Sequence, residues 1–486
     1  MKNGKLPRTV TNWDAEGLAT VYGCHCGTEY FGQLGDGRAV TITEHEGYEI
    51  QLKGSTQTPF SRGFDGKATL RGCVRELLGC EGLSGLNVPT TLSLSVIGTG
   101  EIIERPWYSN NDQPRNTGRK FPPMHMGRER AAVLTRLAKS FLRMGHFEIH
   151  WLRGESEELR KLVLHGMDVL DIGDYDGDWN VRVKEFVNEV SRRQAYLVAS
   201  WLRVGYCQGN MNSDNTAVTG VTLDLGPFAF VDKYSRDFQP FTSDGGGRFG
   251  LCMQPSAALT AVKVWATAVG ACVEGGGGGE EIAMEAERTF REAFEKEWRE
   301  VRRRKLGFET YTARVGDLWG GLEELMERTK HGVDFTVLFA SMVNVGTGGA
   351  GVEEGWEAIR EAFYALDEAP GGRVEEEDEW KVWLREYLEA IEAEGGRGEG
   401  RVDIMTGANP LVVPRNWIMY ECYEKAGGGP LAEGEGGGGE DKDFEKIRDM
   451  MEVVANPYQI YGGVDERIYG RTPKEYVGKP GLAFLS

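Results

Sequence analysis

The sequence predicts an α+β fold of two lobes, with strands and helix mixed over residues 1–125 and a mainly helical lobe over 126–486. Two observations predict this division. Residues from about 18 to 105 combine short strand-like runs with one helix-like stripe, whereas helical spacing of apolar residues dominates from about residue 130. The 486 residues, of which 40% are hydrophobic, are enough to give both lobes a sizeable core.

The first lobe contains one clear strand and one clear helix. Tyr48–Lys53 alternates between outward and inward positions, as a half-buried strand does. The helix is predicted from apolar residues that recur at helical spacing, namely Leu70, Cys73, Val74, Leu77 and Leu78.

The second lobe begins with helices and ends in charged segments. One apolar stripe predicts a long helix that stops at Gly205, and it consists of Phe186, Val190, Leu197, Trp201 and Val204. The segments Glu280–Arg304 and Glu375–Glu394 read as solvated helices, separated by glycine-rich inserts near 275–279, 395–400 and 436–439.

Composition excludes several classes of function. A net charge of −19 argues against a nucleic-acid partner, because phosphate binding needs clustered Lys and Arg. No apolar run approaches the length of a membrane span, and the first residues carry no apolar core of a secretory signal. The eight cysteines are scattered, which favours reduced thiols in an intracellular compartment.

One short segment carries the strongest functional signal. Asp214-Asn215 is followed by Asp224, and a carboxylate can orient a hydroxyl nucleophile while amide and carboxylate oxygens bind magnesium. The β-branched segment between them has Gly220 near its expected turn, so we expect a short hairpin that returns Asp224 to Asn215. The protein kinase fold uses this arrangement, which predicts a protein-kinase-like two-lobed fold.

A second set of residues suits a nucleotide. Gly32–Arg38 is a glycine-rich turn that could let the backbone approach a phosphate, although most such turns are only turns. Lys53 follows on the predicted strand, where it could reach a phosphate, and Glu76 on the next helix could pair with it. The alternative for Glu76 is an ordinary surface salt bridge.

Two further groups have two interpretations each. Asp65-Gly66 precedes the helix and suits an N-cap and turn, or an anion site at the helix start. Arg136 and Arg143 are spaced to share one helical face among apolar residues, where each needs an anion. That anion is either a protein carboxylate or a phosphate.

Two other patterns resemble metal-binding motifs but are interpreted as not binding a metal ion. Asp174–Glu185 resembles a calcium loop, but Trp179 stands where the sharp turn requires glycine, so it is interpreted as an acidic loop. Cys24-His25-Cys26 has no second pair at zinc-site spacing.

With these residues in view, the chain resembles the selenoprotein O family, a kinase-like family of protein adenylyltransferases. The resemblance rests on ordered blocks between about residues 20 and 270, with weaker matches near Asn409-Pro410 and Pro414–Asn416. The blocks are Gly32–Ala39, Gln51–Gly54, Thr58–Gly63, Asp65–Glu76, Pro89–Thr91, Val133–Arg136, Met211–Asn215, Asp224–Phe228, Ser243–Arg248 and Gln254-Pro255.

The resemblance implies an activity and a set of roles. AMP would pass from ATP to a Ser, Thr or Tyr hydroxyl of a protein, with release of pyrophosphate and dependence on Mg²⁺ or Mn²⁺. Asp214 would be the proton acceptor, and Asn215 and Asp224 the metal ligands. The residues implied to bind ATP are Gly35, Gly37, Arg38, Lys53, Asp65, Gly66, Glu76, Arg136, Arg143 and Asp224.

The sequence also departs from the family. Gln208 stands where the family usually has His, Asn210 replaces an apolar residue, and much of the segment before the glycine-rich turn is missing. The C-terminal cysteine or selenocysteine motif is absent, since the sequence ends in Leu482–Ser486, so its redox control is not expected.

The alternatives are a conventional protein kinase and a catalytically weakened, ATP-binding pseudokinase scaffold. We expect a monomer without membrane or nucleic-acid partners. The family implies a mitochondrial location for a eukaryotic member and a cytoplasmic one otherwise.

Overall fold

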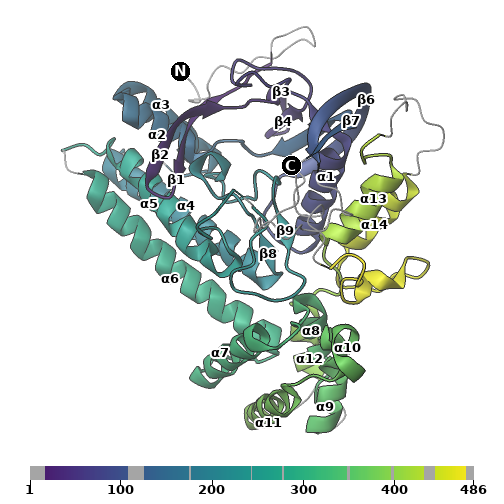
Figure 1. Cartoon of the computed structure of the whole chain (residues 1–486). Coiled ribbons are helices and arrows are strands. Elements are labelled where there is room, and N and C mark those ends of the chain that lie inside the picture. The colour runs from purple at the N-terminus through teal and green to yellow at the C-terminus, as the bar shows by residue number, and fades with distance from the viewer. Residues whose placement is uncertain are drawn as a thin grey trace.

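The structure is a computed structural model that describes residues 17–107, 125–173, 177–241, 243–275, 278–346, 351–395, 399–431 and 444–477. Strands dominate the early part of the chain and helices the remainder (Figure 1). This arrangement confirms the predicted α+β fold. None of the helices in these ranges is long and apolar enough to cross a membrane.

The early part is built on a five-stranded antiparallel sheet in the order β3-β4-β7-β5, with β6 also paired to β7. A separate hairpin of β1 and β2 precedes it, and β8 pairs with β9 deeper in the chain. The strands are β1 (Val21–Cys26), β2 (Glu29–Gly35), β3 (Ala39–His45), β4 (Tyr48–Lys53), β5 (Ala68–Thr69), β6 (Leu92–Trp107), β7 (His125–Ala138), β8 (Tyr206–Cys207) and β9 (Ala229–Phe230).

The sheet extends further along the chain than the sequence predicted. β7 continues the sheet to Ala138, past the expected lobe boundary at 125 and through a region where helices were expected. Strands β4 and β5 pair with one edge of β7, and β6 pairs with its other edge. Its residues Ala131, Ala132 and Leu134 are all buried, so both faces are covered in this part of the strand and no polar–apolar alternation marks it.

The helices comprise fourteen α-helices within the described ranges and five 3₁₀ turns. The α-helices are α1 (Leu70–Gly85), α2 (Met144–Arg153), α3 (Ser156–Val169), α4 (Trp179–Arg203), α5 (Gln254–Gly270), α6 (Gly278–Leu306), α7 (Ala313–Arg328), α8 (Phe335–Met342), α9 (Val352–Ile359), α10 (Ala365–Glu368), α11 (Glu377–Glu394), α12 (Glu399–Thr406), α13 (Asn416–Lys425) and α14 (Glu445–Ala455). The 3₁₀ turns are η1 (Ser213–Asn215), η2 (Leu251–Met253), η4 (Arg360–Ala362), η5 (Pro370–Gly372) and η6 (Glu466–Tyr469).

Helix α1 forms where its apolar stripe predicted it. It packs against both the sheet and the C-terminal helices. Its N-cap is Thr69, whose hydroxyl accepts a hydrogen bond from the Gly72 N–H. Helices α13 and α14 pack against α1 although they lie far away in sequence (Figure 1). One hydrophobic core therefore includes the sheet side of the molecule, α4, α5 and the C-terminal helices.

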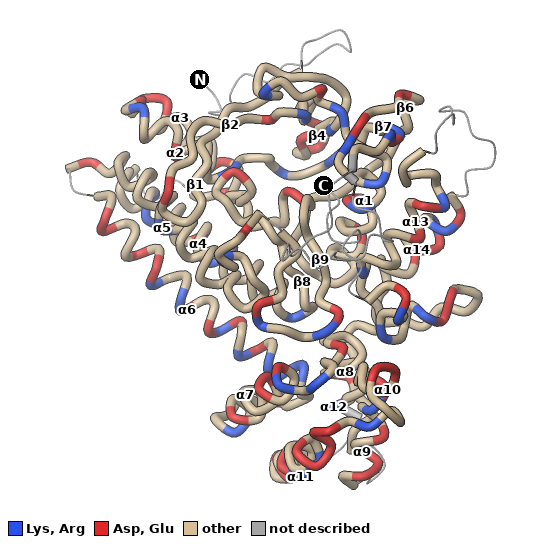
Figure 2. The backbone as a smooth tube through the Cα atoms, viewed as in Figure 1, with Lys and Arg blue, Asp and Glu red and all other residues tan. Residues whose placement is uncertain are grey.

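A second core holds together the helices between α7 and α11. The predicted solvated helix over 375–394 is only half solvated, because α11 buries Trp380, Trp383 and Tyr387 against this core. Its charged residues lie on the opposite face. Figure 2 shows acidic and basic residues alternating along α6, where pairs such as Arg291–Glu287 join successive turns.

The structure describes only part of the acidic segment that resembles a calcium loop. Asp174, Tyr175 and Asp176 lie outside the described residues, and Asp178 serves as the N-cap of α4. Within the described ranges, no three His, Cys, Asp or Glu side chains gather in a way that could hold a metal ion.

Candidate active site

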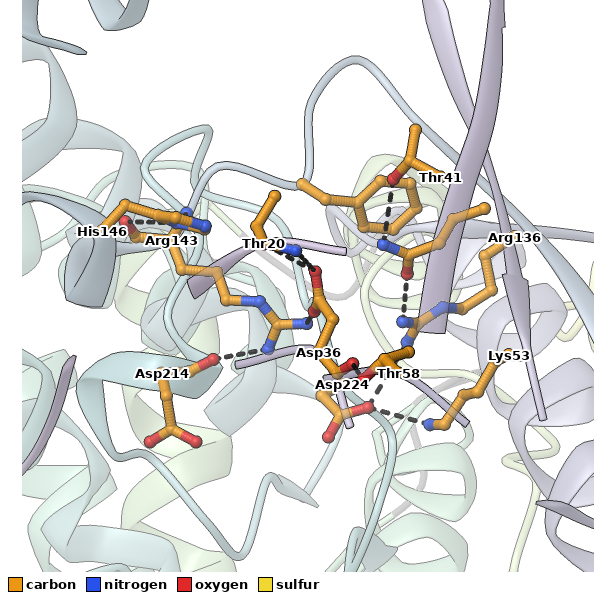
Figure 3. Close-up of polar contacts among 12 residues, drawn as sticks. Thr20, Asp36, Thr41, Lys53, Thr58, Arg136, Arg143, His146, Asp214 and Asp224 are labelled. Atoms are coloured by element: carbon orange, nitrogen blue, oxygen red, sulfur yellow. Dashed lines mark hydrogen bonds and ion pairs between the residues drawn. The ribbon is translucent and has the colours of Figure 1, made fainter. Parts of the chain in front are cut away.

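The candidate site centres on the Asp224 carboxylate, which lies among cations (Figure 3). Lys53 Nζ lies 2.9 Å from Asp224 Oδ1 and 2.5 Å from Glu76 Oε2. Arg136 Nη1 lies 3.1 Å from Glu76 Oε1 and 3.4 Å from Asp224 Oδ1. The structure therefore brings together four residues that the sequence placed on separate elements, including the predicted Lys53–Glu76 pair.

The sheet register explains how Lys53 and Arg136 meet. Gln51 and Lys53 are two residues apart on β4, so they point to the same face of the sheet. Arg136 stands directly opposite Gln51 on β7 and donates a hydrogen bond to its side-chain oxygen. A neutral glutamine thus orients the guanidinium, and the strand alternation that predicted Lys53 could also have pointed to Gln51.

The prediction that Arg136 and Arg143 share a helical face is wrong. Arg136 is on β7, and Arg143 is the N-cap residue of α2, after the strand has ended. Spacing of seven fits a helix, but the segment is a strand because it pairs with β4, β5 and β6. The two guanidiniums nevertheless approach the same site from different elements.

Protein carboxylates already neutralise both arginines. Arg143 Nη2 lies 3.3 Å from Asp36 Oδ1, and Asp36 is itself 2% exposed. The Thr20 N–H and hydroxyl donate to the other oxygen of Asp36, at 2.9 and 2.6 Å. Of the two alternatives for the arginines' anion, the structure contains the carboxylates, so a phosphate is not required to explain their burial. Asp36 lies inside the glycine-rich segment but was not predicted as a site residue.

Asp214 and Asn215 form the 3₁₀ turn η1 beside this cluster. Burial raises the pKa of Asp214, although a hydrogen bond with the Cys24 thiol and the charge of Arg143 act in the opposite direction. Asp214 Oδ1 is buried without a hydrogen-bond partner among the described residues. The Asp214 main-chain oxygen accepts a hydrogen bond from Arg143, which holds the turn against α2.

The chain between Asn215 and Asp224 returns as predicted, but as a loop rather than a stranded hairpin. A single antiparallel bridge joins Thr216 to Thr222, and Gly220 adopts a φ of 72° at the turn. The side chain of Gln208, which stands where the resembling family usually has His, donates a 2.6 Å hydrogen bond to the Asp224 main-chain oxygen. Gln208 thus supports the position of Asp224.

The cations around Asp224 keep its carboxyl group ionised. Burial acts to raise the pKa of Asp224, but Lys53, Arg136 and Arg143 outweigh it and hold the pKa well below its usual range. An ionised carboxylate oxygen is the ligand that a hard cation prefers.

Close packing against Phe60 explains why positions 35 and 37 are glycine. Gly35 ends β2 and Gly37 lies in the following turn. A Cβ atom on Gly35 would lie 2.4 Å from the Phe60 ring, and one on Gly37 would lie 3.1 Å from the Phe60 main-chain oxygen. Arg38 continues into β3, and its main-chain oxygen accepts a hydrogen bond from the Gly54 N–H at 2.7 Å.

The contacts described for Asp65 and Gly66 do not involve the residues around Asp224. Arg105 Nη2 lies 2.6 Å from Asp65 Oδ1, which also accepts a hydrogen bond from the Lys67 N–H. Asp65 is therefore not the N-cap of α1, a role that Thr69 takes. Gly66 has a φ of 69° in the turn before β5.

Asn215 and Asp224 suit magnesium by their chemistry. Mg²⁺ is often bound by one or two protein carboxylates together with substrate phosphates, so it does not need a cage of acidic residues. Asn215 offers an amide oxygen and Asp224 an ionised carboxylate. The buried Oδ1 atoms of Asn212 and Asp214 also have no hydrogen-bond partner among the described residues. These oxygen atoms could bind a cation or accept a hydrogen bond from a substrate hydroxyl.

Comparisons with known proteins agree over most of the chain. A family model described as protein adenylyltransferase SelO matches residues 11–455. The chain is 31% identical over 481 residues to the "Protein nucleotidyltransferase YdiU" of Aromatoleum aromaticum, covering 97% of this chain and 84% of that protein. It is 32% identical to proteins of the same name from Azoarcus sp. (91% and 79% covered) and Xanthomonas campestris pv. campestris (90% and 78%).

Proposed function

This chain belongs to the protein adenylyltransferase SelO family, and on that premise we propose that it transfers AMP from ATP to a Ser, Thr or Tyr hydroxyl of a protein acceptor. The proposal rests on the contacts of Lys53 and Arg136 with Asp224, next to the turn that contains Asp214 and is held by Arg143. Lysine and arginine side chains gathered in this way can donate charge-assisted hydrogen bonds to the phosphate oxygens of ATP.

Asp214 is assigned as the proton acceptor. The acceptor hydroxyl oxygen forms a bond to the α-phosphorus of ATP, the bond from that phosphorus to the bridging oxygen breaks, and pyrophosphate leaves. The hydroxyl proton moves to the Asp214 carboxylate. The buried Oδ1 atom of Asp214 has no hydrogen-bond partner among the described residues, which supports this role, since it could accept a hydrogen bond from the hydroxyl.

The nucleotide is assigned to the surrounding residues. Lys53, Arg136 and Arg143 would bind phosphate oxygens, with Glu76 holding Lys53 in place. The remaining residues proposed to contact ATP are Gly35, Gly37, Arg38, Asp65 and Gly66.

Asn215 and Asp224 are assigned as ligands of Mg²⁺ or Mn²⁺. When bound, the ion would offset the negative charge on the phosphate oxygens. The low pKa of Asp224 keeps this ligand ionised at neutral pH.

Labelled ATP tests the proposal. The protein is incubated with Mg²⁺, candidate protein acceptors and ATP labelled on either the α- or the γ-phosphate. We expect protein to gain label from the α position only. The second candidate is phosphotransfer, because protein kinases also use a Lys–Glu pair and a metal-binding Asp, and it would transfer only the γ label. ATP binding without any transfer would instead favour the pseudokinase scaffold.

A further inference from the structure

A buried network joins the β1–β2 hairpin, helix α2 and the catalytic turn behind Asp214. The His25 N–H donates a 2.9 Å hydrogen bond to Ser213 Oγ, and Ser213 Oγ donates a 2.6 Å hydrogen bond to Glu148 Oε2. His25 Nδ1 lies 2.8 Å from the same Glu148 oxygen. The three contacts close a ring between residues that are distant in sequence.

The network is buried, and only one oxygen of its carboxylate has partners among the described residues. His25, Glu148 and Ser213 are 6%, 0% and 1% exposed. Both contacts of Glu148 fall on Oε2, while Oε1 is buried without a hydrogen-bond partner among the described residues. Burying a carboxylate whose second oxygen has no partner among the described residues costs folding free energy. The presence of Glu148 is therefore weak evidence that the network serves only to stabilise the fold.

Ser213 is the residue immediately before Asp214, which places the network one peptide unit from the proton acceptor. On the other side, Arg143 donates to the main-chain oxygen of Asp214. The main chain of the turn is therefore held from both directions, while Asp214 Oδ1 stays without a partner among the described residues.

We propose that His25, Glu148 and Ser213 are positioning residues that fix the catalytic turn so that the Asp214 carboxylate meets the acceptor hydroxyl. This inference rests on the proposed AMP transfer. The network contributes to proton acceptance, whereas the Lys53, Arg136 and Asp224 cluster contributes to nucleotide binding. Loosening the network therefore lowers kcat and leaves the KM for ATP unchanged.

The test compares Ser213→Ala and Glu148→Gln with a matched control. Glu155→Gln is the control, because Glu155 Oε2 pairs with His150 Nδ1 of α2 at 2.6 Å but is partly exposed and has no contact with the turn among those of the described residues. Each variant is assayed as the full chain for kcat and KM with α-labelled ATP, and its folded fraction is measured by circular dichroism.

We expect kcat to fall about 10- to 100-fold in Ser213→Ala and Glu148→Gln, as displacement of a catalytic group does. The KM for ATP should stay within about twofold, and Glu155→Gln should match the wild type. A purely structural role would instead lower activity in proportion to the folded fraction.

Unchanged kcat per folded molecule in both variants, or a raised KM with unchanged kcat, would overturn the inference. Should Ser213→Ala fail to fold, Glu148→Gln decides, since it keeps the side-chain shape. A wild-type protein that transfers no α label would reject the proposed function itself, which separates the two failures.

Discussion

At the scale of single residues, the site depends on how charges are shared around Asp224. Lys53, Glu76 and Asp224 were predictable because strand alternation, helical spacing and motif order each pointed to one of them. The Arg143–Asp36 pair was not, because its partners are 107 residues apart and approach from a helix start and a turn. No local pattern in the sequence encodes such a contact.

Removing the Asp224 carboxylate should abolish metal-dependent nucleotide binding. ATP with Mg²⁺ at about 100 times its Kd would stabilise the wild type by about 2.7 kcal/mol, and neither Asp224→Ala nor Asp224→Asn should show this gain. The measurement is thermal unfolding with and without ATP and Mg²⁺. Asp465→Asn is the control, because Asp465 pairs with Arg467 at the surface and should leave the gain intact. Equal gains in all proteins would contradict the assignment.

The pH dependence of transfer should reflect the raised pKa of Asp214. A proton acceptor works only when deprotonated, so the rate falls as pH drops through that raised pKa. The Cys24 thiol lowers this pKa, so Cys24→Ala should move the acidic limb of the kcat/KM profile to higher pH. Cys24→Ser keeps a donor and should move it less. An unmoved limb, or one shifted to lower pH in Cys24→Ala, would show that the thiol has no such influence.

At the scale of elements, β4 and α1 form where their periodicity placed them, whereas β7 could not be recognised. Tyr48–Lys53 has one face toward the core, so alternation marks it. β7 lies inside the sheet with both faces covered from Ala131 to Leu134, and the spacing between its Arg136 and Arg143 fits a helix equally well. Tertiary pairing therefore decided the structure of the segment that carries Arg136.

Two glycines of one loop should respond differently to alanine. Gly63 and Gly66 both have positive φ, at 85° and 69°. A Cβ atom on Gly63 would have no atom of the described residues within 4 Å, whereas one on Gly66 would lie 2.3 Å from the Thr56 main-chain oxygen. Gly63→Ala should cost about 1–2 kcal/mol of unfolding free energy from the backbone alone, and Gly66→Ala clearly more. Urea denaturation measures both, and equal losses would contradict the steric reason.

At the scale of the whole molecule, the C-terminal helices support the element that carries Glu76. Arg75, the neighbour of Glu76 on α1, is buried and donates to Asn416 Oδ1 at 3.0 Å and to the Phe228 main-chain oxygen at 3.1 Å. Helix α1 is thus held between the segment after Asp224 and helix α13. This long-range packing lay beyond what local patterns in the sequence could predict.

The C-terminal segment is also fastened by a buried ion pair. Arg415, 1% exposed, lies 2.7 Å from both Asp334 Oδ1 and Asp232 Oδ1. Arg415→Met leaves these carboxylates without their cation and should cost about 3–5 kcal/mol of unfolding free energy. Arg467→Met, at a surface pair with Asp465, should cost about 0–1 kcal/mol. Comparable losses in denaturant unfolding would contradict the importance of burial.

We propose above all that the residues around Asp214 and Asp224 attach AMP to protein. Intact-mass spectrometry of an acceptor protein after incubation with ATP and Mg²⁺, together with assay of the released product, tests it most directly. We expect a mass gain of one AMP group per modified hydroxyl with an equal amount of pyrophosphate, both lost in Asp214→Ala. A gain of one phosphoryl group with release of ADP would contradict it.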